Sequence, residues 1–98
     1  MTVQELKRLI IKNKDITIID IREIYEFEDG SISELNIPLD QFMIRINEIP
    51  RDKPVVIYCN SGKRSKSLKY MVERNHSFNN IYHLEGGFQK WQEEIVSM

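Results

Sequence analysis

Cys59 is the only cysteine of the chain, and the residues that follow it are suited to activating a thiol. The loop that follows consists of Asn60, Ser61, Gly62, Lys63, Arg64 and Ser65. Loop amides, the N-terminus of a following helix and two adjacent cations all favour the thiolate over the thiol. Because the thiolate is the nucleophilic form of cysteine, we predict covalent chemistry at Cys59, with residues 60–65 as the substrate-binding loop.

A structural interpretation of Cys59 competes with this one. Free cysteines are often small, buried apolar residues, and the Val-Val-Ile-Tyr segment 55–58 before it is apolar. A purely structural cysteine has no need of a glycine turn and two cations directly after it. The composition of the loop therefore favours the reactive interpretation.

The segments around Cys59 explain how it is positioned. The β-branched run 55–57 predicts a buried strand, and residues 60–62 are turn formers. Ser65 is the expected cap of a helix over about 66–73, whose apolar positions recur at helical spacing. Cys59 is then expected at the carboxyl end of a strand, in front of a helix N-terminus, where anions bind.

The loop Cys59-Asn60-Ser61-Gly62-Lys63-Arg64-Ser65 resembles the active-site motif C-x-x-G-x-R-S of rhodanese-like sulfurtransferases. Three other stretches resemble the family segments D-x-R-E…E-F…G, N-I-P-L and L-x-G-G…W, in the same order and at similar spacing. They are Asp20-Ile21-Arg22-Glu23 with Glu26-Phe27 and Gly30, Asn36-Ile37-Pro38-Leu39, and Leu84-Glu85-Gly86-Gly87-Phe88 with Trp91. The segment 31–35 departs from the family, since it lacks a histidine and a second glycine and is one residue shorter.

The resemblance implies a three-layer α/β domain over residues 1–98, with a mostly parallel central sheet flanked by helices. It also implies that Cys59 takes the outer sulfur of an anionic donor such as thiosulfate, becomes a persulfide, and passes the sulfur to a thiol, cyanide or protein acceptor. Loop amides with Lys63 and Arg64 are expected to hold the donor. No cofactor is implied.

The rest of the chain also predicts alternating helices and strands, the pattern of an α/β domain with a parallel sheet. Expected strands cover 16–21, 35–38, 55–58 and 80–84. Expected helices cover 3–11 after a Thr2–Glu5 capping box, 23–29, 40–49 with Asp40 as its cap, 66–73, and a final one with Phe88, Trp91 and Ile95 facing inward. Residues 74–77 are expected to form a connecting loop, and Gly86-Gly87 a turn.

Asp20 and Arg22 fall at the carboxyl end of the first expected strand, at the sheet edge where sites form. Neither supplies a nucleophile or an obvious proton path, so we interpret them as supporting residues that shape the cysteine loop. The alternative is an ordinary surface ion pair, which contributes little to stability.

Composition excludes several classes of function. The chain has 98 residues and a net charge of −1, which predicts one domain with no general attraction to nucleic acid or to a membrane surface. A single cysteine cannot form an internal disulfide, and no segment resembles a signal peptide or a membrane span, so a cytoplasmic location is expected. His76 and His83 lack partners at metal-binding spacing, so no metal site is expected and both are interpreted as surface or loop residues.

Two other functions remain open. Cysteine-dependent phosphatases and arsenate reductases also use a cysteine in an anion-binding loop that ends in arginine. Their loops are one residue longer than the loop between Cys59 and Arg64, which disfavours this alternative. The third possibility is a non-catalytic rhodanese-like binding module, against which the complete set of Cys59, Gly62 and Arg64 argues.

Overall fold

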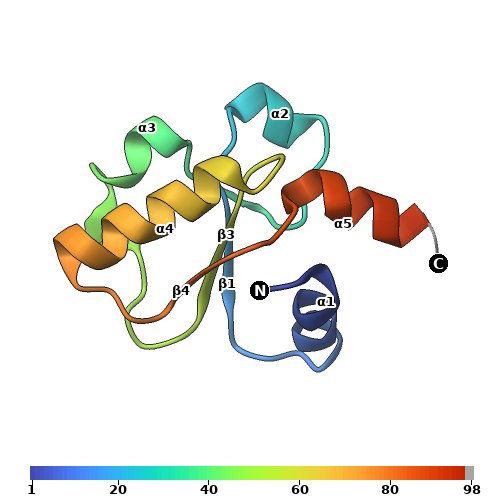
Figure 1. Cartoon of the computed structure of the whole chain (residues 1–98), viewed down its shortest axis with the longest axis horizontal. Helices are drawn as coiled ribbons and strands as arrows, with labels where there is room; N and C mark the ends of the chain where they lie inside the picture. The colour runs from blue at the N-terminus through green and yellow to red at the C-terminus, as the bar shows by residue number, and fades with distance from the viewer. Residues whose placement is uncertain (97–98) are drawn as a thin grey trace.

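The computed structural model describes residues 1–96, with side chains described as far as Glu94. Four strands form one all-parallel sheet in the order β2-β1-β3-β4 (Figure 1). They are β1 (Thr17–Asp20), β2 (Leu35–Asn36), β3 (Val55–Tyr58) and β4 (Ile81–His83). The helices are α1 (Val3–Ile11), α2 (Ile24–Glu28), α3 (Leu39–Phe42), α4 (Lys63–His76) and α5 (Gly87–Val96), with a 3-10 turn η1 (Ile46–Glu48). The predicted α/β fold is confirmed.

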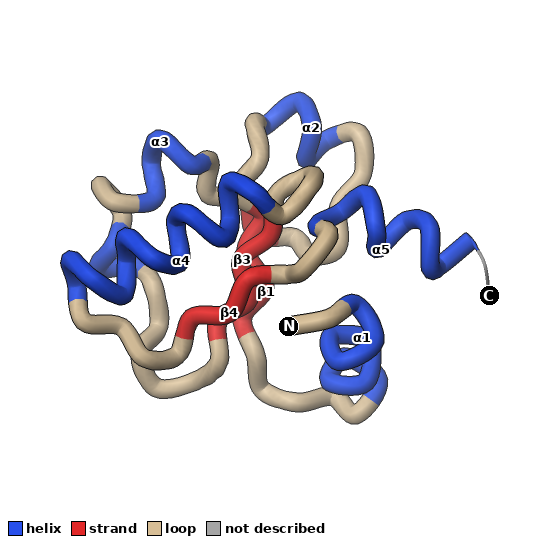
Figure 2. The backbone as a smooth tube through the Cα atoms, in the orientation of Figure 1, coloured by secondary structure: helices blue, strands red, loops and turns tan. Residues whose placement is uncertain are grey.

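Helices cover both faces of the sheet, which gives three layers. Figure 2 shows α3 and α4 on one side of the strands and α1 and α5 on the other. Successive side chains of β3 alternate between the two cores, as expected for a strand buried on both faces. Val55, Ile57 and Cys59 belong to the core under α3 and α4, whereas Val56 and Tyr58 belong to the core under α1 and α5.

The strand register brings three polar side chains to one level at the carboxyl edge of the sheet. Asp20 of β1 is paired with Tyr58 of β3 on one side and with Asn36 of β2 on the other. Cys59 follows Tyr58 directly. The cysteine and the Asp20–Arg22 segment, distant in sequence, therefore lie at the same edge of the sheet.

The expected helix over 40–49 is wrong, because the chain forms the short helix α3 and then η1. Phe42 and Ile49 are buried as the apolar spacing requires. Between Phe42 and Ile49 lie two β-branched residues, Ile44 and Ile46, which lower the helix propensity of this stretch. The helix therefore does not continue from α3 to Ile49. Asp40 lies inside α3, and Pro38 occupies the cap position.

Other boundaries differ by a few residues. The helix α1 begins after Thr2, whose hydroxyl accepts the backbone N–H of Glu5 at 3.1 Å, as predicted. The helix α4 continues to His76 and ends at Ser77 in a left-handed conformation, so most of the expected loop over 74–77 is helical. In α5, Phe88 is buried and Trp91 packs against the same core, whereas the expected inward position of Ile95 lies outside the described side chains.

The segment 31–34, whose conformation the sequence did not predict, is held by its own hydroxyl groups. Ser33 Oγ donates to the carbonyl of Ile18 at 2.8 Å, and Ser31 Oγ donates to the carbonyl of Ser33 at 2.8 Å. The backbone N–H of Ile32 donates to Tyr58 Oη at 3.0 Å. Ser33 thus attaches this loop to β1, and the backbone of Ile32 attaches it to β3.

Candidate active site

Cys59 lies immediately after β3 and is completely buried. The backbone N–H groups of Gly62 and Ser65 donate to its Sγ at 3.1 and 3.4 Å. The Ser65 hydroxyl lies 3.6 Å from Sγ and also donates to the carbonyl of Gly62 at 3.2 Å. Because a hydroxyl can rotate, Ser65 can accept from a thiol and donate to a thiolate. The loop thus directs hydrogen-bond donors at the sulfur.

The balance of burial and hydrogen bonding favours the thiolate. Burial raises the pKa of Cys59 and is the largest single effect on it. Hydrogen bonds from the backbone and hydroxyl of Ser65, and then from the backbones of Gly62 and Ser61, together outweigh burial. The pKa of Cys59 is therefore lower than that of an ordinary thiol, which makes the sulfur a better nucleophile near neutral pH.

Gly62 sets the start of α4 and corrects the expected cap. Its φ of 98° lies in the region that favours glycine, and it occupies the cap position before Lys63. Ser65, which was expected to cap the helix, lies in its first turn. Its backbone N–H donates to Cys59 Sγ and its hydroxyl donates to the carbonyl of Gly62, so Ser65 helps to form the site around the sulfur instead of capping the helix.

The N-terminus of α5 holds the cysteine loop from the other side. The backbone N–H of Phe88 donates to the carbonyl of Cys59 at 2.9 Å, and that of Gln89 donates to the carbonyl of Asn60 at 3.0 Å. Gly87 has a φ of 63°, and a Cβ there would lie 2.5 Å from the Cys59 carbonyl oxygen. Sequence reasoning missed this role of Gly87, although the Gly86-Gly87 pair at the start of α5 was the available signal.

Asp20 and Arg22 form a buried ion pair, so the alternative of an ordinary surface pair is wrong. Arg22 Nη2 lies 2.7 Å from Asp20 Oδ2 and donates to the carbonyl of Gly30 at 2.6 Å. Tyr58 Oη donates to Asp20 Oδ2 at 2.8 Å, and the Arg22 guanidinium stacks 4.3 Å from the centre of the Phe88 ring. The network joins β1, β3 and α5 beneath the cysteine loop.

The remaining loop residues are distributed around the mouth of the site. Asn60, Ser61 and Lys63 are exposed, whereas Arg64 is partly buried. The Arg64 guanidinium lies 3.5 Å from a carboxylate oxygen of Glu26 in α2. The structure therefore places all six residues of the loop after Cys59 at one site, but one of the two expected cations, Arg64, is paired with a carboxylate.

A family model described as the rhodanese-like domain matches residues 2–94. This chain belongs to the rhodanese-like domain family.

Relatives of this rhodanese-like domain come from several organisms. The uncharacterized protein YqhL of Bacillus subtilis is 46% identical over 79 residues, which cover 80% of this chain and 62% of that protein. A sulfurtransferase of Allochromatium vinosum is 33% identical over 90 residues, covering 90% of this chain and 82% of the relative. A rhodanese-related protein from Thermoplasma volcanium superposes with a TM-score of 0.84 at 30% identity, covering 96% of this chain and 90% of that one.

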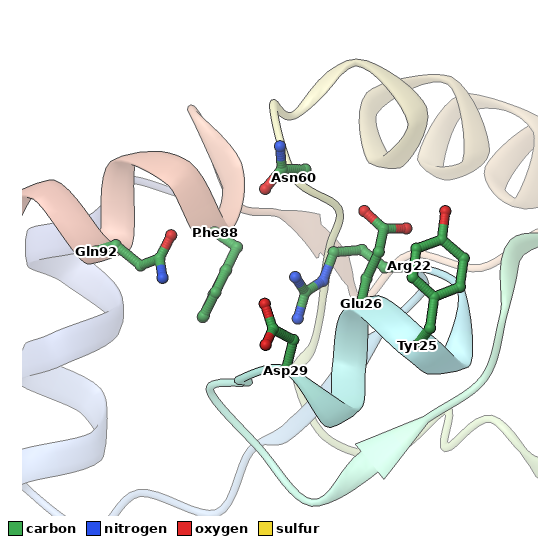
Figure 3. A pocket seen from close by; sticks show the side chains of 7 residues that line it. All are labelled: Arg22, Tyr25, Glu26, Asp29, Asn60, Phe88 and Gln92. Carbon is green, nitrogen blue, oxygen red and sulfur yellow. The ribbon is translucent and has the colours of Figure 1, made fainter.

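Two depressions flank the loop of the rhodanese-like domain. The first, of about 380 Å³, is polar and is shown in Figure 3, where Asn60 and two side chains of α5 face the side chains of α2 and Arg22. Its lining residues are Arg22, Tyr25, Glu26, Asp29, Asn60, Phe88 and Gln92. The second, of about 450 Å³, is mostly apolar and is lined by Leu39, Met43, Lys63, Arg64, Ser67, Leu68 and Met71. Small anions and thiols have space on both sides of the loop.

Within residues 1–96, no three side chains of the ligating types are placed to hold a metal ion. His76 ends α4, and His83 is half-buried at the end of β4. None of the described helices combines the length and apolar character needed to cross a membrane.

Replacing Gly87 with alanine is expected to destabilise the domain by about 2 to 3 kcal/mol, because it combines a strained φ with a collision against the loop backbone. Denaturant unfolding measures the loss. Gly86→Ala is the matched control, since Gly86 also has a positive φ of 81° but the atoms nearest to its added Cβ belong to the Lys90 side chain, not to the backbone of the cysteine loop. Equal losses in the two variants would contradict the role of the contact between Gly87 and the loop.

Proposed function

We propose that this rhodanese-like domain is a sulfurtransferase that carries a sulfane sulfur as a persulfide on Cys59. The observation that carries the proposal is the pair of N–H groups, from Gly62 and Ser65, aimed at a sulfur of lowered pKa. The name of the Allochromatium relative, a sulfurtransferase, supports it. A free reactive thiol of this kind suits a reducing compartment such as the cytoplasm.

The proposed reaction has two displacements. The Cys59 thiolate attacks the outer sulfur of a donor such as thiosulfate, the S–S bond of the donor breaks, and its electron pair leaves with sulfite. An acceptor thiolate, cyanide or a thiol of a partner protein then attacks the outer sulfur of the persulfide, and Cys59 leaves as a thiolate. The loop donors are already oriented before each step, so they stabilise the anionic sulfur with little reorganisation.

The proposed role of residues 60–65 is to receive the donor. Lys63 and Arg64 add positive charge where an anionic donor would approach, and Asn60 and Ser61 are exposed beside them. The ion pair with Glu26 reduces the share of the Arg64 charge that is available to a donor. Asp20 and Arg22 are proposed as supporting residues. They are buried, and Arg22 stacks on the ring of Phe88, whose backbone N–H donates to the carbonyl of Cys59.

Intact mass spectrometry after incubation with thiosulfate tests this function. We expect a gain of one sulfur atom that a reducing agent reverses, because a persulfide is reduced back to a thiol. If no sulfane donor adds a sulfur atom, the sulfurtransferase proposal is wrong. Turnover of a phosphate ester or of arsenate by the same protein would then favour the phosphatase-type alternative.

The rate of sulfur uptake is expected to depend on pH through Cys59. Only the thiolate attacks, and hydrogen bonds in the loop lower the pKa of Cys59, so the rate should rise with pH and reach half its maximum at a pH below the pKa of an ordinary thiol. Initial rates of uptake from thiosulfate measure the profile. Ser65→Ala removes one of the lowering hydrogen bonds and should shift the midpoint upward. A midpoint above that of a free thiol in the natural chain would contradict this prediction.

A further inference from the structure

Glu26 is held firmly beside the cysteine loop, although the proposed reaction does not use it. One carboxylate oxygen accepts the backbone N–H of Glu23 at 3.0 Å, as part of the capping box that starts α2. The other lies 3.5 Å from Nη2 of Arg64. The Glu26 side chain is only 22% exposed. Both of its oxygens are thus engaged, and its position relative to the loop is fixed by the helix.

The ion pair lies between the two depressions that flank the loop. Glu26 lines the polar depression and Arg64 lines the apolar one, while their charged ends are in contact. Along the chain, Arg64 stands between Gly62 and Ser65, whose backbone N–H groups donate to the sulfur. Cys59 itself is 0% exposed, so a donor must pass the residues that line these depressions to reach the sulfur.

Negative charge therefore offsets that of Arg64 at the place where a donor enters. Arg64 is paired with Glu26, and the carboxylate of Asp29 faces the same polar depression in Figure 3. An anionic donor that approaches Arg64 competes with Glu26 for the guanidinium and is repelled by its charge. Because Coulomb repulsion scales with the charge of the donor, a dianion is penalised more than a monoanion of the same shape.

We propose that Glu26 is a positioning residue that sets the charge class of the sulfur donor. By holding Arg64, it disfavours doubly charged donors such as thiosulfate relative to donors with one negative charge or none. This inference rests on the proposed sulfurtransferase function and names the donors that the site prefers.

Two donors that differ by one charge test the inference. Thiosulfate and methanethiosulfonate both present an outer sulfur bonded to a sulfonyl group. Attack by Cys59 breaks the S–S bond in each case, and the electron pair leaves with sulfite or with methanesulfinate. The readout is the ratio of kcat/KM for thiosulfate to kcat/KM for methanethiosulfonate, with a thiol as acceptor.

Glu26→Gln is expected to raise this ratio about threefold to fivefold, as for the loss of one partly exposed charge interaction. The amide oxygen can still accept the N–H of Glu23, so α2 keeps its cap. The change should fall mainly on KM for thiosulfate, because ground-state attraction of the donor is altered. Glu28→Gln is the matched control, since it removes an equal charge from an exposed position on the same helix and should leave the ratio unchanged.

The outcomes separate this inference from the proposed function. If the natural chain accepts sulfur from neither donor, the sulfurtransferase function fails. If both donors react and the ratio is the same in the natural chain and in Glu26→Gln, the inference about Glu26 is overturned while the function stands. Glu26→Ala provides a second variant with the same loss of charge, and it must raise the ratio as well. A rise of equal size in Glu28→Gln would also overturn the specific role of Glu26.

Discussion

Replacing Cys59 with serine is expected to abolish sulfur uptake completely and to leave the fold intact. A hydroxyl does not ionise near neutral pH and cannot carry sulfane sulfur, so the covalent step has no substitute. The serine oxygen can still accept the N–H groups of Gly62 and Ser65, which now point at Sγ. Because those donors keep a partner, the free energy of unfolding should change by no more than about 1 kcal/mol.

The measurement is intact mass spectrometry after thiosulfate treatment, combined with denaturant unfolding of both chains. Uptake of sulfur by the serine variant would contradict the assignment of Cys59. A folded serine variant that loses uptake but keeps the physiological role of the protein would instead favour a binding module, in which the intact loop is not used for catalysis.

The position of Cys59 could be predicted because local patterns determine it. Residues 55–57 are β-branched and are followed by turn formers, so a strand that ends before Cys59 follows from the chain itself. The start of α4 could not be predicted in the same way. Ser65 is a good cap in isolation, but the positive φ of Gly62 lets the helix begin three residues earlier, and the Ser65 hydroxyl then lies beside the sulfur.

The supports of the loop depend on contacts between distant segments, and the sequence does not reveal these. Gly87 approaches the carbonyl of Cys59 from another helix, and nothing near Gly87 in the chain indicates which backbone it meets. The pairing of Arg64 with Glu26 likewise joins α4 to α2. Sequence reasoning therefore indicated the loop from which Gly62 and Ser65 donate to the sulfur, whereas the packing of α2 and α5 decides how that loop is held and which of its charges are offset.

Replacing Asp20 with asparagine is expected to destabilise the domain by about 3 to 5 kcal/mol, the usual cost of leaving one partner of a buried ion pair without compensation. The Asp20 side chain is 0% exposed and that of Arg22 is 4% exposed, so water cannot replace the lost charge. Tyr58 would also lose the carboxylate to which it donates. Denaturant unfolding measures the loss, and sulfur uptake should fall with it because Arg22 stacks on Phe88, which binds the cysteine loop.

Two further variants decide whether the buried charge is responsible. Combining Asp20→Asn with Arg22→Met removes both charges and should recover part of the stability lost in the single variant, because no uncompensated ion is left in the core. Glu48→Gln breaks the exposed Arg45–Glu48 pair and should have little effect on unfolding. If the double variant is less stable than Asp20→Asn alone, the contacts of Arg22 with Gly30 and Phe88 outweigh its charge, and the network supports the loop through packing rather than through the ion pair.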